Sequence, residues 1–393
     1  MDFRDSSEDA AFRAELRAWL ARSLAEAGGL PSDPSAAALH SRAWQRRLAE
    51  AGYVGLAWPR EYGGRAAPPT QQVIFAEECA RAGAPPLING IALGILAPAL
   101  IQHGNEAQKR RFLPRILFAE DLWCQGFSEP GAGSDLSSLQ TRAVVDGDFL
   151  IVNGQKVWTS LAPIADWCFL LVRTGEERTG PRGITYVLMQ MSSAGVRVRP
   201  IRQITGKSHF SEIFLEDVRI PLANVVGELH GGWSVARATL AAERSGLSGV
   251  VELERSLTAL RGLAAARGAL GDPVVRQRLA GLWVEKEALK CTGYRVLTKQ
   301  LRGEALGPEA AIGKLAASEF RRAVMDTALE LQGPYAMLGR GNPRALERGR
   351  WQGLYLDARA YTIGGGTSEI MRNIIAERAL GLPRSVPLTG GFR

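Results

Sequence analysis

The sequence predicts an α+β protein whose helical and β segments follow one another along the chain. The first third repeats apolar residues at helical spacing, and the middle third consists of short β-branched runs separated by turn dipeptides. The last third returns to long helices rich in Ala and Leu. Strands and helices do not alternate, which disfavours a doubly wound parallel sheet. The predicted domains are residues 1–121 (helical), 122–230 (β) and 231–393 (helical).

The first domain is predicted to be helical because its apolar residues recur every three or four positions. The longest apolar run, residues 87–101, is shorter than the roughly 18 residues of a membrane span and contains Asn89 and Pro98. We therefore expect a buried helix there. The residues that carry the helical period are Phe12, Leu16, Trp19 and Leu20, then Trp44 and Leu48, then Val73 to Cys79.

The middle domain is predicted from its turn signals. The stretch AVVDGDFLIVNGQKVW contains the dipeptides Asp146-Gly147 and Asn153-Gly154, both of which favour tight turns between antiparallel strands. Four further strand-like runs follow: CFLLVRT, GITYVLMQM, VRVRPI and EIFLEDVRI.

Composition limits the function classes. The chain has 393 residues, 46% hydrophobic and 22% charged, which predicts a folded protein of two or three packed units. Its net charge of +8 admits nucleic acid, anionic lipid or a phosphate-bearing ligand as partners. The basic residues, however, are mixed with Asp and Glu along the helices, which favours a solvated surface of mixed sign.

No metal or targeting signal is expected. The four cysteines lie far apart without a CxxC pair, so neither a zinc site nor a disulfide framework is predicted. The four histidines show no metal-like spacing. The amino terminus, MDFRDSSEDA, is acidic and lacks an apolar core, so we predict a cytoplasmic protein without a signal peptide or membrane span.

Two stretches of the middle domain are candidates for ligand binding. In FSEPGAGSDLSS, glycines allow close approach of the backbone, and Ser134 and neighbouring amides supply donors to a phosphate. Alone, such a stretch is more often a surface turn. In GQKVWTS, Trp158 lies two residues before Ser160, and a flat ring beside a hydroxyl suits a flat heteroaromatic cofactor. Trp158 is equally compatible with a place in the core.

A third stretch, YTIGGGTSEIMRNIIAER, is predicted to be a glycine loop that enters a helix. Thr367 is placed to cap the first helical turn, and Gly381 and Pro383 to end the helix.

Together, these stretches and their order resemble the acyl-CoA dehydrogenase family, and the resemblance extends over essentially the whole chain to Pro383. It rests mainly on the combination of SEPGAGSD with the later NGQKVW. The resemblance implies a central β-barrel or sandwich, a C-terminal four-helix bundle and FAD as cofactor. It also implies an acyl-CoA substrate, electron-transfer flavoprotein or a similar acceptor as partner, and a homotetramer, a homodimer or a pair of different chains.

The resemblance also implies positions for FAD between the β domain and the C-terminal helices. Ser134 is expected near both the cofactor and the substrate. Arg267 matches a residue that reaches the cofactor phosphates across a subunit contact, but Leu270, Glu330 and Pro334 depart from the family pattern around the adenine end. The remaining cofactor positions implied are Phe127, Ser128, Gly133, Trp158, Ser160, Thr367 and Glu369.

The implied reaction removes a proton from the α carbon of a thioester and a hydride from the β carbon. The site must stabilise the enolate oxygen and desolvate the base. Most relatives carry the base as a Glu directly before the Gly-Thr of the terminal motif, and Gly365 stands there, with only its N–H to offer. Other relatives place a Glu before an arginine on the helix after the β domain, where this chain has Glu243 and Arg244. We predict Glu243 as the base and Arg244 as an ion-pair partner near the substrate.

Several alternatives stay open. Glu243 is also compatible with an exposed helical Glu paired with an Arg. The terminal motif resembles that of bacterial members acting on branched, dicarboxylic or steroid-side-chain thioesters. Some of these assemble from two different chains, so a non-catalytic partner chain is an alternative. A relative that binds DNA ranks lower, because this chain ends soon after the terminal helix.

Overall fold

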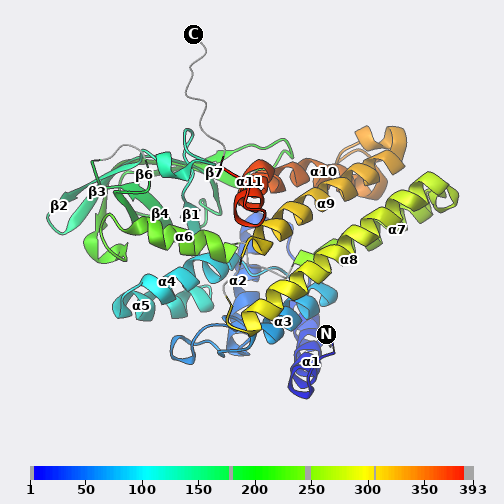
Figure 1. Ribbon diagram of the computed structural model, residues 1–393, viewed down its shortest axis with the longest axis horizontal. Coiled ribbons are helices and arrows are strands. Elements are labelled where there is room, and N and C mark those ends of the chain that lie inside the picture. Colours follow the sequence, from blue (N-terminus) through cyan, green and yellow to red (C-terminus); the bar gives the residue numbers. More distant parts are fainter. Residues whose placement is uncertain (1–3, 177–179, 244–248, 305–306, 385–393) are drawn as a thin grey trace, which may run out of the picture. The chain divides into compact units, whose positions relative to one another are not determined.

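The computed structural model describes residues 4–176, 180–243, 249–304 and 307–384, and the side chains of residues 241–250 lie outside this description. The chain forms two compact units, residues 1–243 and 244–393 (Figure 1). The first unit starts with helices and continues into a β-sheet, and the second is helical. The predicted succession of helical, β and helical segments is therefore confirmed.

The helices of the first unit bury the apolar positions that predicted them. Phe12, Leu16 and Leu20 are buried on one face of the first helix, and Trp44 and Leu48 on the second. Side-chain caps and prolines set the helix starts, as when Asp33 accepts from the Ala36 amide just before Pro34. The helices are α1 (Ser7–Ala27), α2 (Pro34–Glu50), α3 (Pro69–Ala82), α4 (Ala97–His103) and α5 (Glu106–Leu117).

The apolar run 87–101 is helical, as predicted, but its first part is wider than an α-helix. Residues Ala92–Leu96 form a π-helical segment, η2, that leads into α4. Pro98 lacks the N–H that an α-helix would direct to the carbonyl four residues earlier, and the wider turn accommodates this loss. Asn89 is buried and donates to the carbonyls of Ile116 and Asp121, so its polar group is satisfied.

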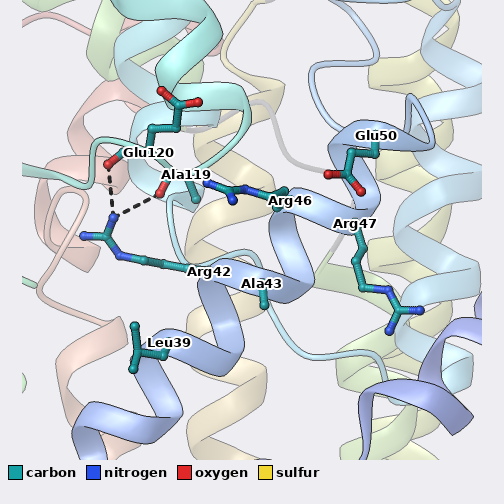
Figure 2. A pocket seen from close by; sticks show the side chains of 8 residues that line it. All are labelled: Leu39, Arg42, Ala43, Arg46, Arg47, Glu50, Ala119 and Glu120. Carbon is teal, nitrogen blue, oxygen red and sulfur yellow. Dashed lines mark hydrogen bonds between the residues drawn. The ribbon is translucent and has the colours of Figure 1, made fainter.

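Arg42 of α2 anchors the turn that leads into the sheet. Its guanidinium donates to the carbonyls of Ala119 and Glu120, both at 3.1 Å (Figure 2). It also pairs with Asp166 at 3.0 Å. Asp166 in turn accepts from the Leu122 amide at 2.8 Å. Arg42, Ala119 and Glu120 border a surface groove of about 610 Å³ that is lined by none of the predicted site residues.

In the described part of the chain the sheet has eight strands, in the order β6-β7-β3-β2-β4-β5-β8, with β1 paired to β4. Most pairs are antiparallel, but β1 runs parallel to β4. The strands are β1 (Trp123–Gly126), β2 (Arg142–Asp146), β3 (Phe149–Ser160), β4 (Trp167–Arg173), β5 (Ile184–Gln190), β6 (Val196–Ile201), β7 (Phe210–Pro221) and β8 (Val225–Val226).

One of the two predicted turns is wrong. Asp146-Gly147 does turn the chain between β2 and β3, where Asp146 pairs with Phe149. Asn153-Gly154, however, lies inside β3, at a register shift against β7. A Cβ at position 154 would lie 2.6 Å from the Thr141 hydroxyl oxygen, and φ of Gly154 is +153°. The glycine therefore serves a close approach within the sheet instead of a turn.

Helix α6 (Gly232–Glu243) closes the first unit and packs against β5, η2 and α4 (Figure 1). Its start lies so close to the sheet that a Cβ on Gly232 would be 2.3 Å from the Tyr186 amide nitrogen. Glycine at this position thus fixes α6 directly on β5.

The second unit is helical throughout its described secondary structure. Helix α9 packs against α7, α8, α10 and α11, and the core between them includes Leu260, Phe320, Val324 and Trp351. The helices are α7 (Gly249–Ala266), α8 (Pro273–Leu301), α9 (Glu309–Gln332), α10 (Arg350–Tyr361) and α11 (Ser368–Arg378).

Candidate active site

A buried ion pair joins the two motifs of the β segment. Lys156, from GQKVWTS, is completely buried, and its Nζ lies 2.8 Å from Oε1 of Glu129, from FSEPGAGSD. Glu129 also accepts from the amides of Thr141 at 2.9 Å and Gln140 at 2.6 Å. The pair therefore fixes one motif against the other across residues far apart in sequence.

The two groups of this pair differ in how burial affects them. Burial opposes ionisation of Glu129, but the charge of Lys156 and hydrogen bonds from Lys156, Thr141 and Gln140 hold the pKa of this carboxyl below its usual range. Burial lowers the pKa of the Lys156 ammonium, and the Glu129 carboxylate opposes that shift. The carboxylate is thus ionised at neutral pH, and it stabilises the lysine charge that burial disfavours.

The same lysine orients the backbone of the first motif. Its Nζ also donates to the carbonyl of Phe127 at 3.2 Å, and the Val157 amide donates to the carbonyl of Ser128 at 2.9 Å. Because C=O and N–H point in opposite directions in a trans peptide, holding the Phe127 carbonyl inward turns the Ser128 N–H outward. The Phe127 ring itself is buried, edge-on to Phe169 at 5.7 Å.

Trp158 is not a core residue. Its side chain is 59% exposed, and it lies in the register shift between Lys156 and Thr159, with φ of +62°. Left-handed backbone is unfavourable for a tryptophan and concentrates at functional sites. The Trp158 ring meets Phe210 edge-on at 6.1 Å, and Ser160 ends β3 opposite that same residue. An exposed flat ring therefore lies two residues before a hydroxyl at the end of β3, and a cofactor site there stays a prediction.

The glycines of the first motif form a tight exposed turn. Glu129 and Ala132 exchange backbone hydrogen bonds at 2.9 and 3.1 Å, which leaves Gly131 at the tip. Gly133 and Ser134 follow on the exposed side. A hollow of about 470 Å³ lies beside this turn and is lined by residues of both motifs, including Gly131 and Gln155.

The C-terminal glycine loop is built as predicted. Thr367 caps α11 by accepting from the Ile370 amide at 3.1 Å. Gly365 and Gly366 have φ of +68° and +100°, in the region that favours glycine. Glu369, in the first turn of α11, is exposed and pairs with Arg372 at 3.5 Å.

The predicted adenine-end residues also lie in the second unit. Arg267 follows α7, donates to the carbonyl of Leu331 at 3.3 Å and lies over the Tyr335 ring at 5.7 Å. Glu330 forms an ion pair with Arg278. Leu270 and Pro334, which depart from the family pattern, each lie in a short 3₁₀ turn, Ala269–Gly271 and Gly333–Met337 respectively.

Glu243 is the last residue of α6, and its side chain lies outside the described residues, as does all of Arg244. The backbone of Glu243 belongs to the first unit, whose sheet carries both motifs. Within the described ranges, no three His, Cys, Asp or Glu side chains are grouped as a metal site would require. No helix in the part of the chain that is described is long and apolar enough to cross a membrane.

Comparison with known proteins decides the family. Profiles of the acyl-CoA dehydrogenase N-terminal, middle and C-terminal domains match residues 6–120, 124–218 and 230–380. The chain belongs to the acyl-CoA dehydrogenase family. It is therefore an oxidoreductase acting on CH–CH groups, in a family that depends on FAD.

Individual acyl-CoA dehydrogenases match over almost their whole length. Acyl-CoA dehydrogenase IpdE1 of Mycobacterium tuberculosis is 43% identical, over 95% of this chain and 97% of its own. Among solved structures, the Tcur3481-Tcur3483 steroid ACAD aligns at a TM-score of 0.84 with 30% identity, over 98% of this chain and 100% of its own. The ChsE4-ChsE5 complex of M. tuberculosis aligns at 0.84 with 33% identity, over 98% and 100%.

Sequence reasoning missed the groups that hold the site. Lys156 and Glu129 belong to the two quoted motifs. A lysine at an inward-facing strand position and a glutamate in the loop of the other motif could have predicted a buried ion pair. Lys314 and Glu319 of α9, which hold the glycine loop, carry no such signal, because they are ordinary charged residues of a helix.

Proposed function

We propose that this acyl-CoA dehydrogenase binds FAD and desaturates an acyl-CoA thioester at its α and β carbons, with Glu243 as the α-proton base. The observation that carries the proposal is that one of the two positions where the family places its base lacks an acid, while the other has one. Gly365 has no side chain to accept a proton, and a glutamate instead ends α6, the helix packed on the sheet that bears both motifs.

The described residues fit a flavin. Trp158 offers an exposed flat ring beside the Ser160 hydroxyl, and the Lys156-anchored backbone directs the Ser128 amide outward. Phe127, Gly133 and Ser134 would contribute from the same motif. On the second unit, Arg267, Thr367 and Glu369 are the proposed contacts, where the start of α11 favours an anion. The cofactor would supply the acceptor for the β-hydride.

The chain's own groups would handle the α proton. The Glu243 carboxylate would take it, and the electron pair would move onto the thioester oxygen. The Gly365 N–H, which requires no side chain, would donate to that oxygen and stabilise its charge. Ser134 and Arg244 are the further proposed neighbours of the substrate, Arg244 as the ion-pair partner of the base.

For the substrate we propose an acyl-CoA derived from a steroid. The support is the likeness over the whole chain to the Tcur3481-Tcur3483 steroid ACAD and the terminal motif noted above. For the electron acceptor we propose an electron-transfer flavoprotein or a similar carrier.

A second candidate follows from assembly. The Tcur3481-Tcur3483 and ChsE4-ChsE5 structures are each named for two chains. This chain would then be the flavin-holding partner of a different, catalytic chain instead of a self-sufficient homotetramer or homodimer. The presence of Glu243 together with intact SEPGAGSD favours the catalytic role.

The test is the absorbance of the purified flavoprotein with a panel of acyl-CoA thioesters, steroid-derived ones included. We expect the flavin colour to bleach in the wild type and in Glu254→Gln, a matched change at an exposed glutamate of α7. Glu243→Gln should retain flavin and bleach more slowly by roughly 10²–10⁴-fold. Undiminished bleaching in Glu243→Gln would place the base elsewhere. Bleaching that needs a second chain would favour the partner role, and a colourless protein that binds DNA would refute both.

A further inference from the structure

Helix α9 holds the glycine loop from two sides. The Lys314 ammonium donates to the carbonyl of Gly366. One turn further along α9, Glu319 accepts from the Ser368 hydroxyl at 2.9 Å and pairs with Arg322 at 2.8 Å. The loop between α10 and α11 is therefore tied to α9 both at its last glycine and at the start of α11.

These ties leave a set of backbone amides directed away from the chain's own acceptors. The amides of Ile363 and Gly364 both donate to the Ala360 carbonyl, at 3.1 and 2.8 Å, and the Ser368 amide donates to Thr362 at 3.0 Å. Between them, the amides of residues 365–367 have no acceptor among the described residues. Backbone N–H groups without such an acceptor are available to donate to a bound ligand.

Sequence alone would leave this loop adaptable. Consecutive glycines reach many backbone conformations, so the direction of an amide within them is not fixed by local preference. Two contacts restrict the peptide between Gly366 and Thr367 here, and with it the loop. Lys314 holds the Gly366 carbonyl, and the Met371 side chain lies where a Cβ of Gly366 would be, at 2.4 Å from the methyl carbon.

We propose that Lys314 is a positioning residue that ties the Gly366–Thr367 peptide of the glycine loop to α9 and so restrains the loop conformation in which the Gly365 N–H is presented. The inference rests on the proposed function, in which that N–H donates to the thioester oxygen. In this role Lys314 acts through the Gly366 carbonyl and not through contact with substrate or cofactor. Its contribution is to keep the donor aimed at the oxygen while the α proton passes to the Glu243 carboxylate and the electron pair moves onto that oxygen.

The experiment separates proton removal from hydride transfer. A 3-thia-acyl-CoA carries an ionisable α proton but a sulfur at the β position, so no hydride can leave. Its enolate beside oxidised flavin gives a long-wavelength absorbance band, and titrating that band against pH reports the apparent pKa of the bound α proton. The variants are Lys314→Met, Lys314→Arg and Lys299→Met, the last removing a lysine of α8 that pairs with Glu309 in the same unit.

We expect Lys314→Met to raise the apparent pKa of the bound analogue and to reduce the enolate fraction at a given pH by roughly tenfold, since misaimed donors stabilise the oxyanion less. Lys314→Arg should recover part of the loss, because a guanidinium can also donate to the carbonyl. Lys299→Met should titrate like the wild type, with flavin content and melting temperature measured in parallel.

Two outcomes would contradict the reasoning in different ways. If Lys314→Met or, should it fail to fold, Lys314→Ala titrates like Lys299→Met and the wild type, the positioning role is wrong and the proposed function stands. If the flavin-loaded wild type forms no enolate band, the proposed function fails and this inference fails with it.

Discussion

The Lys156–Glu129 pair makes a quantitative prediction about stability. Lys156 is completely buried, so Lys156→Met leaves the Glu129 carboxylate in the interior without its cation. Breaking such a buried pair costs about 3–5 kcal/mol of unfolding free energy. Adding Glu129→Gln removes the second charge and keeps an oxygen that accepts from a backbone amide, so the double variant should lose only about 1–2 kcal/mol. The expected coupling free energy is at least about 2 kcal/mol.

Urea unfolding followed by tryptophan fluorescence measures both single variants and the double variant. The matched control is a double-mutant cycle on Arg197 and Glu216, whose charged groups lie 3.0 Å apart and whose side chains are both about two-thirds exposed. That surface pair should give a coupling of under about 1 kcal/mol. If the coupling free energy of the buried pair is no larger than that of the surface pair, this account of the two motifs is refuted. A double variant that folds should still lose flavin, because the Phe127 carbonyl has lost its donor.

Two further predictions concern stability. The arginines of α1 and α3 overcome the effect of burial and lower the pKa of Glu78 to about 2, so its contribution is present above the ordinary pKa of a glutamate and is lost as pH falls from about 5 towards 2. Glu78→Gln should remove on the order of 3 kcal/mol at pH 7 and little at pH 2, as measured by urea unfolding at each pH. Gly154→Ala should cost about 2 kcal/mol or more because of its contact with Thr141, whereas Gly147→Ala, in an open turn, should cost about 1 kcal/mol. Equal losses in the two glycine variants would contradict the close-approach account.

Local signals in the sequence predicted the parts of the fold that depend on near neighbours. The helical spacing of Phe12, Leu16 and Leu20 predicted the buried face of α1, and Thr367 was recognised as a cap, because both features act within a few residues of the chain. Asp146-Gly147 was read correctly as a turn for the same reason.

Features that depend on distant residues were not predictable in this way. Asn153-Gly154 carries the same turn signal, but the approach of Thr141, just before β2, decides its conformation. Trp158 was left open between core and ligand site, since its exposure follows from a register shift against β7 that no local pattern shows. The direction of the Gly366 carbonyl depends on Lys314, on another helix and distant in sequence.

The conformation of the glycine loop bears on why a base would lie on α6. Gly365 has φ of +68°, a region that costs a residue with a side chain about 1–2 kcal/mol. A glutamate there would have to accept that strain or shift the loop, and a shift would turn the amides that α9 now holds in place. In the proposed reaction, different segments therefore stabilise the thioester oxygen and accept the α proton. The loop supplies a backbone donor whose aim requires glycine, and the carboxylate comes from the end of a helix whose start is fixed on β5 by the close contact of Gly232.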